Sequence, residues 1–181
     1  MFEGKKVRLR SIEMSDLEDI MKDWNNLKLR KFLMTPLPYS REEEEEWIRS
    51  TWERRKKGTG YLFAIEDKET KEFLGSGGLE SVNNINRSAE LGIAIHAERN
   101  WSKGYGTDSM EVLLKIGFDY LNFHRIQLRV HEYNARAIRV YEKVGFTQIG
   151  KLREAHFFNG EYHDVILMDI LKEEWSKKKH Q

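Results

Sequence analysis

The sequence predicts a mixed α/β (α+β) protein that forms one domain over residues 1–181. Segments with the two-residue period of strands and segments with the helical period alternate along the chain, in the order β-α-α-β-β-β-α-β-α-β-β. At 181 residues the chain is long enough to bury a core. It contains no internal repeat, low-complexity tract or linker, so nothing in the sequence divides it into two domains.

The first part of the chain is predicted to form a strand and two helices. Apolar and charged residues alternate over 7–10, as in a short strand with one buried face. Ser40 and Glu43 have the spacing of a capping box, which indicates the start of a helix, and Pro36 and Pro38 fix the loop before it. Largely apolar stripes at helical spacing mark the two helices: Leu17, Ile20, Met21 and Trp24 in the first, and Trp47, Ile48, Thr51 and Trp52 in the second.

The rest of the chain is predicted to combine six strands with two more helices. Four of the strands are expected over 61–66, 72–79, 88–95 and 125–130. One helix has the apolar stripe Met110, Leu113, Leu114, Gly117 and Phe118. The other begins at Asn134 and ends at Gly145, a residue typical of helix C-caps. Asn159-Gly160 predicts a tight hairpin between the last two strands.

Composition and charge exclude several kinds of protein. With 31 Lys and Arg against 30 Asp and Glu, the net charge is +1, so we expect neither a nucleic-acid nor a membrane partner. The chain has no cysteine, which excludes disulfides and thiol nucleophiles, and its six histidines lack the spacing of metal ligands. Charges interrupt the N-terminus, and no apolar run approaches the roughly 18 residues of a membrane span, so we expect a cytoplasmic protein. Abundant Lys and Glu without Cys favour a thermophilic source.

The segment 91–107 is the most informative motif. It is predicted to be a strand, a short turn and the start of a helix, with Gly104 and Gly106 at the junction. Glycines there let the backbone curl tightly and leave N–H groups free at a helix N-terminus, an arrangement that binds phosphate. The nucleotide-binding pattern G-x-x-x-x-G-K-[ST] is absent, and Asp108 and Ser109 stand where a dinucleotide fingerprint has its third glycine. On these residues alone, a purely structural turn is the alternative.

A second motif lies farther along the chain and resembles that of a known family. Residues 134–146 fit the pattern N-x-x-A-x-x-x-Y-x-x-x-G-F after a predicted strand. Together with the glycine turn, they make the chain similar to the GNAT acetyltransferase superfamily over nearly its whole length. Segments 7–10, 101–107 and 156–164 resemble the branch that contains ribosomal-protein N-terminal acetyltransferases and spermidine acetyltransferases. The resemblance implies a single domain whose central twisted sheet is mixed and mostly antiparallel, flanked by about four helices and splayed at the fourth and fifth strands.

The resemblance also implies a site for acetyl-CoA, the acetyl donor, and no metal. In this family the glycine turn holds the pyrophosphate, the strand before it pairs with the pantetheine arm, and the Asn of the second motif contacts the cofactor. Trp101 stands where the superfamily more often has Gln or Arg, as is usual in this branch. The expected cofactor contacts are Ile93, Ala94, Ile95, Trp101, Ser102, Lys103, Gly104, Tyr105, Gly106, Thr107, Asn134, Arg136, Ala137 and Tyr141.

Tyr141 and Glu90 are the expected catalytic residues. The resemblance places the tyrosine near the thioester sulfur, where its hydroxyl can protonate the departing thiolate. Glu90 is the one acid in the otherwise apolar segment 89–95, and a carboxylate there can accept the amine proton directly or through a water. Backbone N–H groups of 93–95 are expected to polarise the acetyl carbonyl. On the residues alone, a core tyrosine and a solvent-facing carboxylate are the alternatives.

The acceptor is expected to be a primary amine that attacks the thioester directly. Its expected contacts are Leu33, Met34, Glu90, Phe157 and Phe158, from the loop before the second helix and from the last hairpin. The hairpin is similar to that of spermidine acetyltransferases, but those enzymes have acidic residues in the first loop and this chain has none at 34–38. We therefore expect a protein N-terminal α-amine, with a polyamine or an aminoglycoside-like amine as the alternative. A catalytically silent acetyl-CoA-binding module is the non-enzymatic alternative, and a homodimer is common in this branch.

Overall fold

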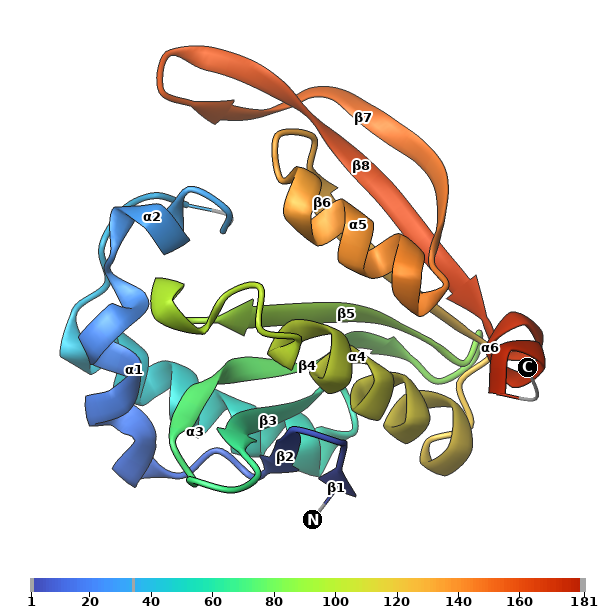
Figure 1. Ribbon diagram of the computed structural model, residues 1–181, viewed down its shortest axis with the longest axis horizontal. Coiled ribbons are helices and arrows are strands. Elements are labelled where there is room, and N and C mark those ends of the chain that lie inside the picture. The colour runs from blue at the N-terminus through green and yellow to red at the C-terminus, as the bar shows by residue number, and fades with distance from the viewer. Residues whose placement is uncertain (1, 34, 180–181) are drawn as a thin grey trace.

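The computed structural model describes residues 2–33 and 35–179 (Figure 1). Within these ranges, eight strands form one sheet in the order β1-β2-β3-β4-β5-β6-β8-β7. Only β5 and β6 pair in parallel, and every other pair is antiparallel, which confirms the expected mixed sheet. The strands are β1 (Phe2–Glu3), β2 (Val7–Arg10), β3 (Tyr61–Asp67), β4 (Phe73–Asn83), β5 (Ser88–Ile95), β6 (Arg125–His131), β7 (Thr147–Phe158) and β8 (Glu161–Leu171).

Helices cover both faces of the sheet. In Figure 1, α4 and α5 lie in front of the sheet and α3 lies behind it. A π-helical turn, Ile116–Tyr120, continues α4, and short 3-10 turns occur at Met14–Asp16 and Glu98–Asn100. The α-helices are α1 (Leu17–Trp24), α2 (Leu27–Arg30), α3 (Arg41–Lys57), α4 (Tyr105–Lys115), α5 (Ala135–Val144) and α6 (Lys172–Lys179).

Strand β3 separates two hydrophobic cores. Phe63 and Ile65 belong to the larger core, which includes the buried face of α4. Leu62 and Ala64 belong to a smaller core with residues of α1 and α3. Successive side chains of a strand point to opposite faces of its sheet, so one apolar run serves both cores. This explains why the strand is apolar almost throughout rather than alternating.

Several local sequence signals form the structures they predict. Ser40 Oγ accepts the Glu43 N–H at 3.2 Å, and Glu43 Oε2 accepts the Ser40 N–H at 2.7 Å, which completes the capping box of α3. Gly145 ends α5 with φ +114°. Asn159 and Gly160 have φ of 53° and 86°, and a two-residue turn with both φ positive fits the twist of β7 and β8.

The structure also contains elements that the sequence analysis does not predict: β1, α2, α6 and the π-helical turn. α2 lies in the expected loop between the first two long helices. Asn26 caps it by accepting the Lys28 N–H at 2.9 Å. The buried guanidinium of Arg30, at its end, lies 5.5 Å from the ring centre of Trp24 and 4.7 Å from that of Tyr39. Its N-cap and the contacts of Arg30 with the segments just before and after it therefore hold this short helix.

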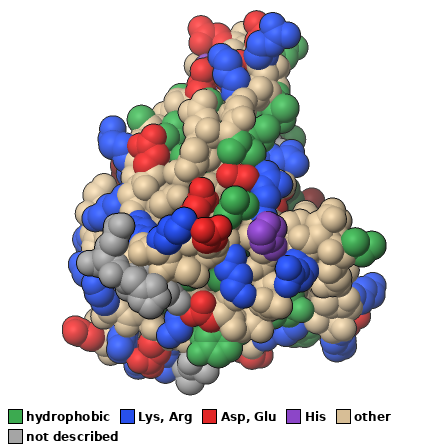
Figure 2. Space-filling view, turned by 90° about the vertical axis from the view of Figure 1, so that its right-hand side faces the viewer, with side chains coloured by type: hydrophobic (Ala, Val, Ile, Leu, Met, Phe, Trp, Pro, Cys, Tyr) green, Lys and Arg blue, Asp and Glu red, His purple; other side chains and the backbone are tan. Residues whose placement is uncertain are grey.

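The surface carries both signs of charge. On the face shown in Figure 2, basic and acidic side chains are interspersed, and its described part has no large area of one sign. Within the described ranges, no helix is long and apolar enough to cross a membrane.

The divergence of β5 and β6 positions the site. These strands pair only over Ser88–Glu90 and Arg125–Gln127. Beyond that point β5 stays paired with β4, and β6 stays paired with β8. The two strands therefore separate, and the edge of β5 from Leu91 onward is open on the side of β6. This is the splay expected between the fourth and fifth predicted strands, which are β5 and β6 here.

Candidate active site

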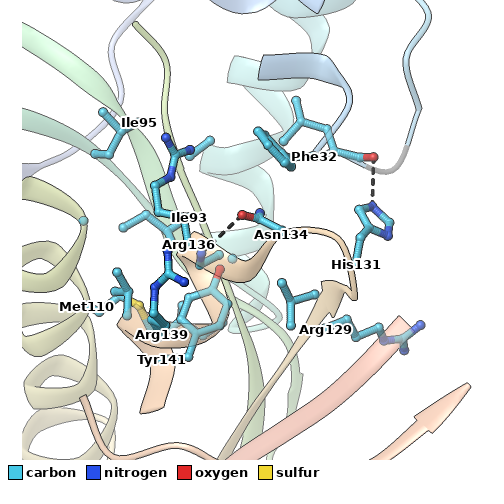
Figure 3. A pocket seen from close by; sticks show the side chains of 18 of the residues that line it. Phe32, Ile93, Ile95, Met110, Arg129, His131, Asn134, Arg136, Arg139 and Tyr141 are labelled. Carbon is cyan, nitrogen blue, oxygen red and sulfur yellow. Dashed lines mark hydrogen bonds between the residues drawn. The ribbon is translucent and has the colours of Figure 1, made fainter. Parts of the chain in front are cut away.

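A pocket of about 720 Å³ occupies the opening between β5 and β6. One end, the turn end, is formed by Ile93–Ile95 of β5, the turn into α4, and Tyr141 of α5. The other, the histidine end, is formed by Glu90, Arg129 and the stacked rings of His131 and His156. Figure 3 shows Ile93, Ile95 and Tyr141 apart from Arg129 and His131, with Asn134 between the two groups. The two ends differ in how they are built.

The turn end is made largely of backbone. Gly104 is the N-cap of α4 and has φ +88°, a conformation that favours glycine. Next to it, a Cβ at Gly106 has no atom within 4 Å, so the space above the turn is open. The first N–H groups of α4 have no acceptor inside the helix and carry the positive end of its dipole. The turn can therefore receive a phosphate without any cationic side chain.

A buried carboxylate ties the start of α4 to the start of β2. Asp108 accepts hydrogen bonds from the backbone N–H groups of Lys5, Lys6 and Val7 at 2.9, 2.7 and 2.9 Å. In addition, Lys6 Nζ donates to the carbonyl of Lys103 at 2.8 Å. These four bonds fix the glycine turn against a strand of the sheet.

An aromatic and cationic stack closes one side of the turn end. Trp101 Nε1 donates to the carbonyl of Ile95 at 2.7 Å, so the indole is held against the end of β5. The guanidinium carbon of Arg136 lies 3.9 Å from the Trp101 ring centre and 5.7 Å from that of Phe32. Burial lowers the pKa of Arg136 from its usual value. Arg136 thus joins the start of α5 to the turn and to the segment after α2.

The second motif places Asn134 and Tyr141 on the pocket wall. Asn134 is the N-cap of α5, and its Oδ1 accepts the Ala137 N–H at 3.2 Å (Figure 3). Because the side-chain oxygen of Asn134 accepts this capping hydrogen bond, the side-chain amide N–H groups remain as donors to a ligand. Burial raises the pKa of Tyr141 to about 12. The phenol is therefore protonated at neutral pH and can act as a proton donor.

Glu90 lines the histidine end, but it does not stand alone. Its Oε1 lies 3.3 Å from Arg129 Nε, and the two side chains are 27% and 48% exposed. The net charge of the Glu90–Arg129 pair is therefore close to zero. The carboxylate is thus already engaged by a cation at the place where an amine would enter.

The two histidines form the inner wall of the histidine end. Their ring centres are 3.8 Å apart with planes 25° from parallel, and both side chains are more than nine-tenths buried. His131 Nε2 lies 3.2 Å from the carbonyl oxygen of Leu33 (Figure 3). Burial lowers the pKa of His131, and the nearby His156 lowers it further. Burial, with a smaller effect of His163, also lowers the pKa of His156.

Most of the residues expected at the site line the pocket, and a few do not. Lys103 and Tyr105 lie outside its lining, and the Tyr105 hydroxyl instead donates to Asp67 at 2.6 Å. Phe157 is 58% exposed and packs on Tyr162. The expected residues on the wall are Leu33, Glu90, Ile93, Ala94, Ile95, Trp101, Ser102, Gly104, Gly106, Thr107, Asn134, Arg136, Ala137 and Tyr141.

Phe158 and Met34 are the two remaining expected acceptor contacts. Phe158 is not in the pocket lining, but its ring stacks 6.3 Å from His156 and 6.1 Å from Tyr133. Met34 lies outside the described residues.

The sequence analysis does not identify Phe32, Arg129, His131 or His156 as site residues. One signal was present for His131, which follows buried Val130 and so breaks the alternation of β6 just before the second motif. No comparable signal marks His156. Among the described residues, no group of three or more His, Cys, Asp or Glu side chains is arranged to hold a metal ion.

Comparisons with known proteins agree with this geometry. Residues 6–147 match the family model described as an acetyltransferase (GNAT) domain. The spermidine N(1)-acetyltransferase of Vibrio cholerae is 34% identical over 176 residues, covering 95% of this chain and 96% of the relative. A provisionally named ribosomal N-acetyltransferase of Bacillus subtilis, YdaF, is 32% identical over 101 residues, covering 56% of this chain and 55% of the relative.

Solved structures extend the similarity to three dimensions. The Vibrio cholerae spermidine acetyltransferase in complex with CoA and spermine has a TM-score of 0.85 at 32% identity, covering 94% of this chain and 98% of that chain. A dodecameric structure of the same enzyme has a TM-score of 0.79 at 33% identity, covering 96% and 98%. The open glycine turn and the uncapped helix N-terminus fit the phosphates of CoA. This chain therefore belongs to the GNAT acetyltransferase family, and it is an N-acetyltransferase that uses acetyl-CoA as its donor.

Proposed function

We propose that this enzyme acetylates a primary alkylamine of the polyamine class. The observation that carries the proposal is the extent of the similarity to a spermidine acetyltransferase, which spans 95% of this chain. The ribosomal-type relative matches only 56% of it. We therefore prefer the polyamine, the alternative in the sequence analysis, over the N-terminal α-amine favoured there.

Acetylation requires a neutral amine, and the cost of reaching it depends on the acceptor. An alkylamine with a pKa of about 10.4 must give up its proton at pH 7 at a cost of about 4–5 kcal/mol. An α-amino group with a pKa near about 8 needs only about 1 kcal/mol. A polyamine acetyltransferase therefore needs an effective proton acceptor at the end of the pocket that holds the amine.

In the proposed reaction, the turn end binds the phosphates of acetyl-CoA, which supplies the activated acetyl group. Tyr141 donates its hydroxyl proton toward the sulfur as the carbon–sulfur bond breaks. Because burial keeps the phenol protonated, the proton is available over the whole neutral range. Burial also makes a thiolate more basic than it is in water, which favours this transfer. Glu90 lines the opening between β5 and β6 through which the ammonium group approaches, with its charge balanced by Arg129.

A second candidate acceptor is a protein N-terminal α-amine. Residues 31–39, which follow α2 in the sequence, contain no Asp or Glu, and Leu33 of this segment lines the pocket. Glu90 of the histidine end is paired with Arg129, so this end offers little net negative charge to a polycation. An acceptor with a single amine of low pKa suits such a site.

A thiol-release assay with acetyl-CoA distinguishes these functions. The panel contains spermidine, spermine, an aminoglycoside, and peptides that begin with Ser or Ala. We expect the highest kcat/KM for spermidine or spermine, and the Tyr141→Phe variant gives the background rate. A higher kcat/KM for the peptides would replace the polyamine with the N-terminal acceptor. Binding of acetyl-CoA without turnover of any amine would indicate a silent binding module.

We also propose that the enzyme associates with copies of itself. The support is the dodecameric form of the Vibrio relative, together with exposed apolar side chains on the β7–β8 hairpin, namely Ile149, Leu152, Phe157 and Tyr162. Light scattering after size-exclusion chromatography measures the mass directly. A mass equal to the 21.6 kDa chain at micromolar concentration would contradict this proposal.

A further inference from the structure

We propose that the stacked pair His131–His156 is the proton acceptor for the attacking amine. This inference rests on the proposed N-acetyltransferase reaction and names the group that makes the amine neutral. It does not depend on whether the amine belongs to a polyamine or to a peptide.

The pair is at the right place in the pocket. His131 ends β6, and His156 lies in β7, where it pairs with His163 of β8. Both rings line the same pocket as Glu90 and Tyr141. An acceptor amine that enters at the histidine end therefore meets these imidazoles as it approaches the thioester.

The hydrogen bonding of His131 fixes its tautomer. A carbonyl oxygen can only accept, so the contact with Leu33 places the ring proton on Nε2. Nδ1 then carries the lone pair, and it is buried without a hydrogen-bond partner among the described residues. Nε2 of His156 is likewise buried without a partner there. Buried polar atoms are normally satisfied, so two pocket-lining histidines that each keep an unpaired nitrogen can accept a donor that enters beside their rings.

The surroundings favour a neutral pair that can take one proton. Tyr133 lies beside the pair, with its ring centre 5.3 Å from that of His131 and 6.2 Å from that of His156. The ring centre of Phe158 lies 6.3 Å from that of His156. An imidazolium formed next to these aromatic rings is stabilised by their π electrons, whereas two imidazoliums 3.8 Å apart repel each other.

The other titratable and charged groups around the two histidines are held in ion pairs. The histidine pair is therefore the group best placed to accept a proton. Glu90 is held by Arg129, as described above. Asp164 of β8 is held by Lys151 of β7. His163 Nδ1 lies 3.6 Å from Glu132 Oε1, and the Glu132 side chain is 44% exposed, so this pair is near the surface.

The protons balance as follows. The ammonium group of the acceptor loses one proton to the histidine pair, which later releases it to solvent. The neutral amine forms the carbon–nitrogen bond while the carbon–sulfur bond breaks. Tyr141 gives its hydroxyl proton to the departing sulfur, and the second amine proton leaves the nitrogen and restores the Tyr141 phenol, directly or through water. The remaining hydrogen stays on the amide nitrogen.

The test is the pH dependence of His131→Gln with spermidine or, if the peptides are better acceptors, with the best peptide. We expect kcat/KM to fall at least about 100-fold at pH 7, in the range typical of a lost general base. The defect should shrink as the pH rises toward the pKa of the amine, because the amine then becomes neutral unaided. The affinity for acetyl-CoA, measured by calorimetry, should stay the same. His124→Gln, at an exposed histidine away from the pocket, is the matched control.

Two further measurements guard against a folding defect and against a failure of the proposed function. His156→Phe keeps the stack but removes the neighbour that lowers the pKa of His131, so the acidic limb of the rate profile should move to higher pH. In the unmodified protein, nitrogen NMR of the histidines should show His131 with its proton on Nε2 and a pKa below the usual 6.5 or so, even if no amine turns over.

Three results would overturn the inference. One is a His131→Gln defect of the same size at every pH, which indicates a purely structural role. Another is loss of the acidic limb in Glu90→Gln while His131→Gln retains it. The third is an NMR spectrum with the His131 proton on Nδ1.

Discussion

The turn end of the pocket is formed largely by backbone groups, whereas the histidine end is formed by side chains. Apart from Tyr141 of α5, the turn end consists of the first N–H groups of α4, two glycines and the free edge of β5, all within one segment, 91–107. The histidine end consists of side chains from the segment after α2, from β5 and β6, and from β7. Backbone N–H groups can bind a phosphate regardless of the side chains around them. The side chains that line the histidine end can be replaced without disturbing the sheet. The difference suggests that the donor is fixed by the fold and the acceptor by residues that can vary.

The largest expected effect is at the turn end. In Gly106→Glu, the new side chain enters the open space above the turn and places a negative charge where a phosphate belongs. We expect the affinity for acetyl-CoA to fall at least about 100-fold, since burying an unpaired charge and repelling a phosphate each cost several kcal/mol. Calorimetry measures it. Gly150→Glu, at a glycine that also has open space but lies outside the pocket lining, is the control, and equal binding by both variants would disprove the phosphate assignment.

Tyr141→Phe tests the boundary between the two ends. Removing the hydroxyl should lower kcat at least about ten-fold, toward the about 10²–10⁴ typical of a general acid, and should leave acetyl-CoA affinity almost unchanged. Steady-state kinetics with calorimetry on the same preparation separates the two effects. An unchanged kcat would remove Tyr141 from the mechanism.

Arg136→Gln tests whether the stack between Arg136, Trp101 and Phe32 joins the two ends. A partly desolvated cation–π contact contributes about 1–2 kcal/mol, so we expect KM for acetyl-CoA to rise about five- to thirty-fold. Glu142→Gln changes an exposed charged residue on the same helix that lies outside the pocket lining, and it serves as the comparison. If only the amine KM changes, the stack belongs to the acceptor alone.

The smallest expected effect is on acceptor preference. Arg129→Gln releases the Glu90 carboxylate from its ion pair, which makes the histidine end more negative. We expect KM for spermidine to fall by a few-fold, with a smaller change for a peptide α-amine, because a half-exposed ion pair contributes only about 0–1 kcal/mol. The ratio of the two kcat/KM values is the measurement. An equal change for both acceptors would show that Glu90 does not discriminate by charge.

The sequence predicts the turn end well because its signals are local. Gly104 needs a positive φ, and Asn134 and Gly145 cap a helix at each end, so the residue types themselves report the backbone. The splay of β5 and β6 followed from the resemblance and is confirmed. Fold details that depend on contacts between distant segments were missed. One is the π-helical turn, where Gly117 lies so close to Ile126 that a Cβ there would come within 2.5 Å of its Cδ1.

The histidine end could not be read from the sequence for a related reason. His131 and His156 lie in separate strands, and only the sheet order β6-β8-β7 brings their rings together. Each alone looks like an isolated histidine in or beside a strand. Glu90 was found because it interrupts an apolar strand, but its partner Arg129 was not, since ion pairs across a splayed sheet leave no pattern in either strand.

The three hydrogen bonds to Asp108 connect the proposed acetyl-CoA site to the segment between β1 and β2. The carboxylate holds the first turn of α4 in place only while the backbone of residues 5–7 keeps its position at the start of β2. Gly4 lies so close that a methyl group there would come within 2.4 Å of Asp108 Oδ2 and displace it. We therefore expect a change that displaces β1, such as a peptide tag, a crosslink or a bound partner, to lower the affinity for acetyl-CoA without contacting the pocket. Residues 5–7 thus help to hold the proposed donor site in position.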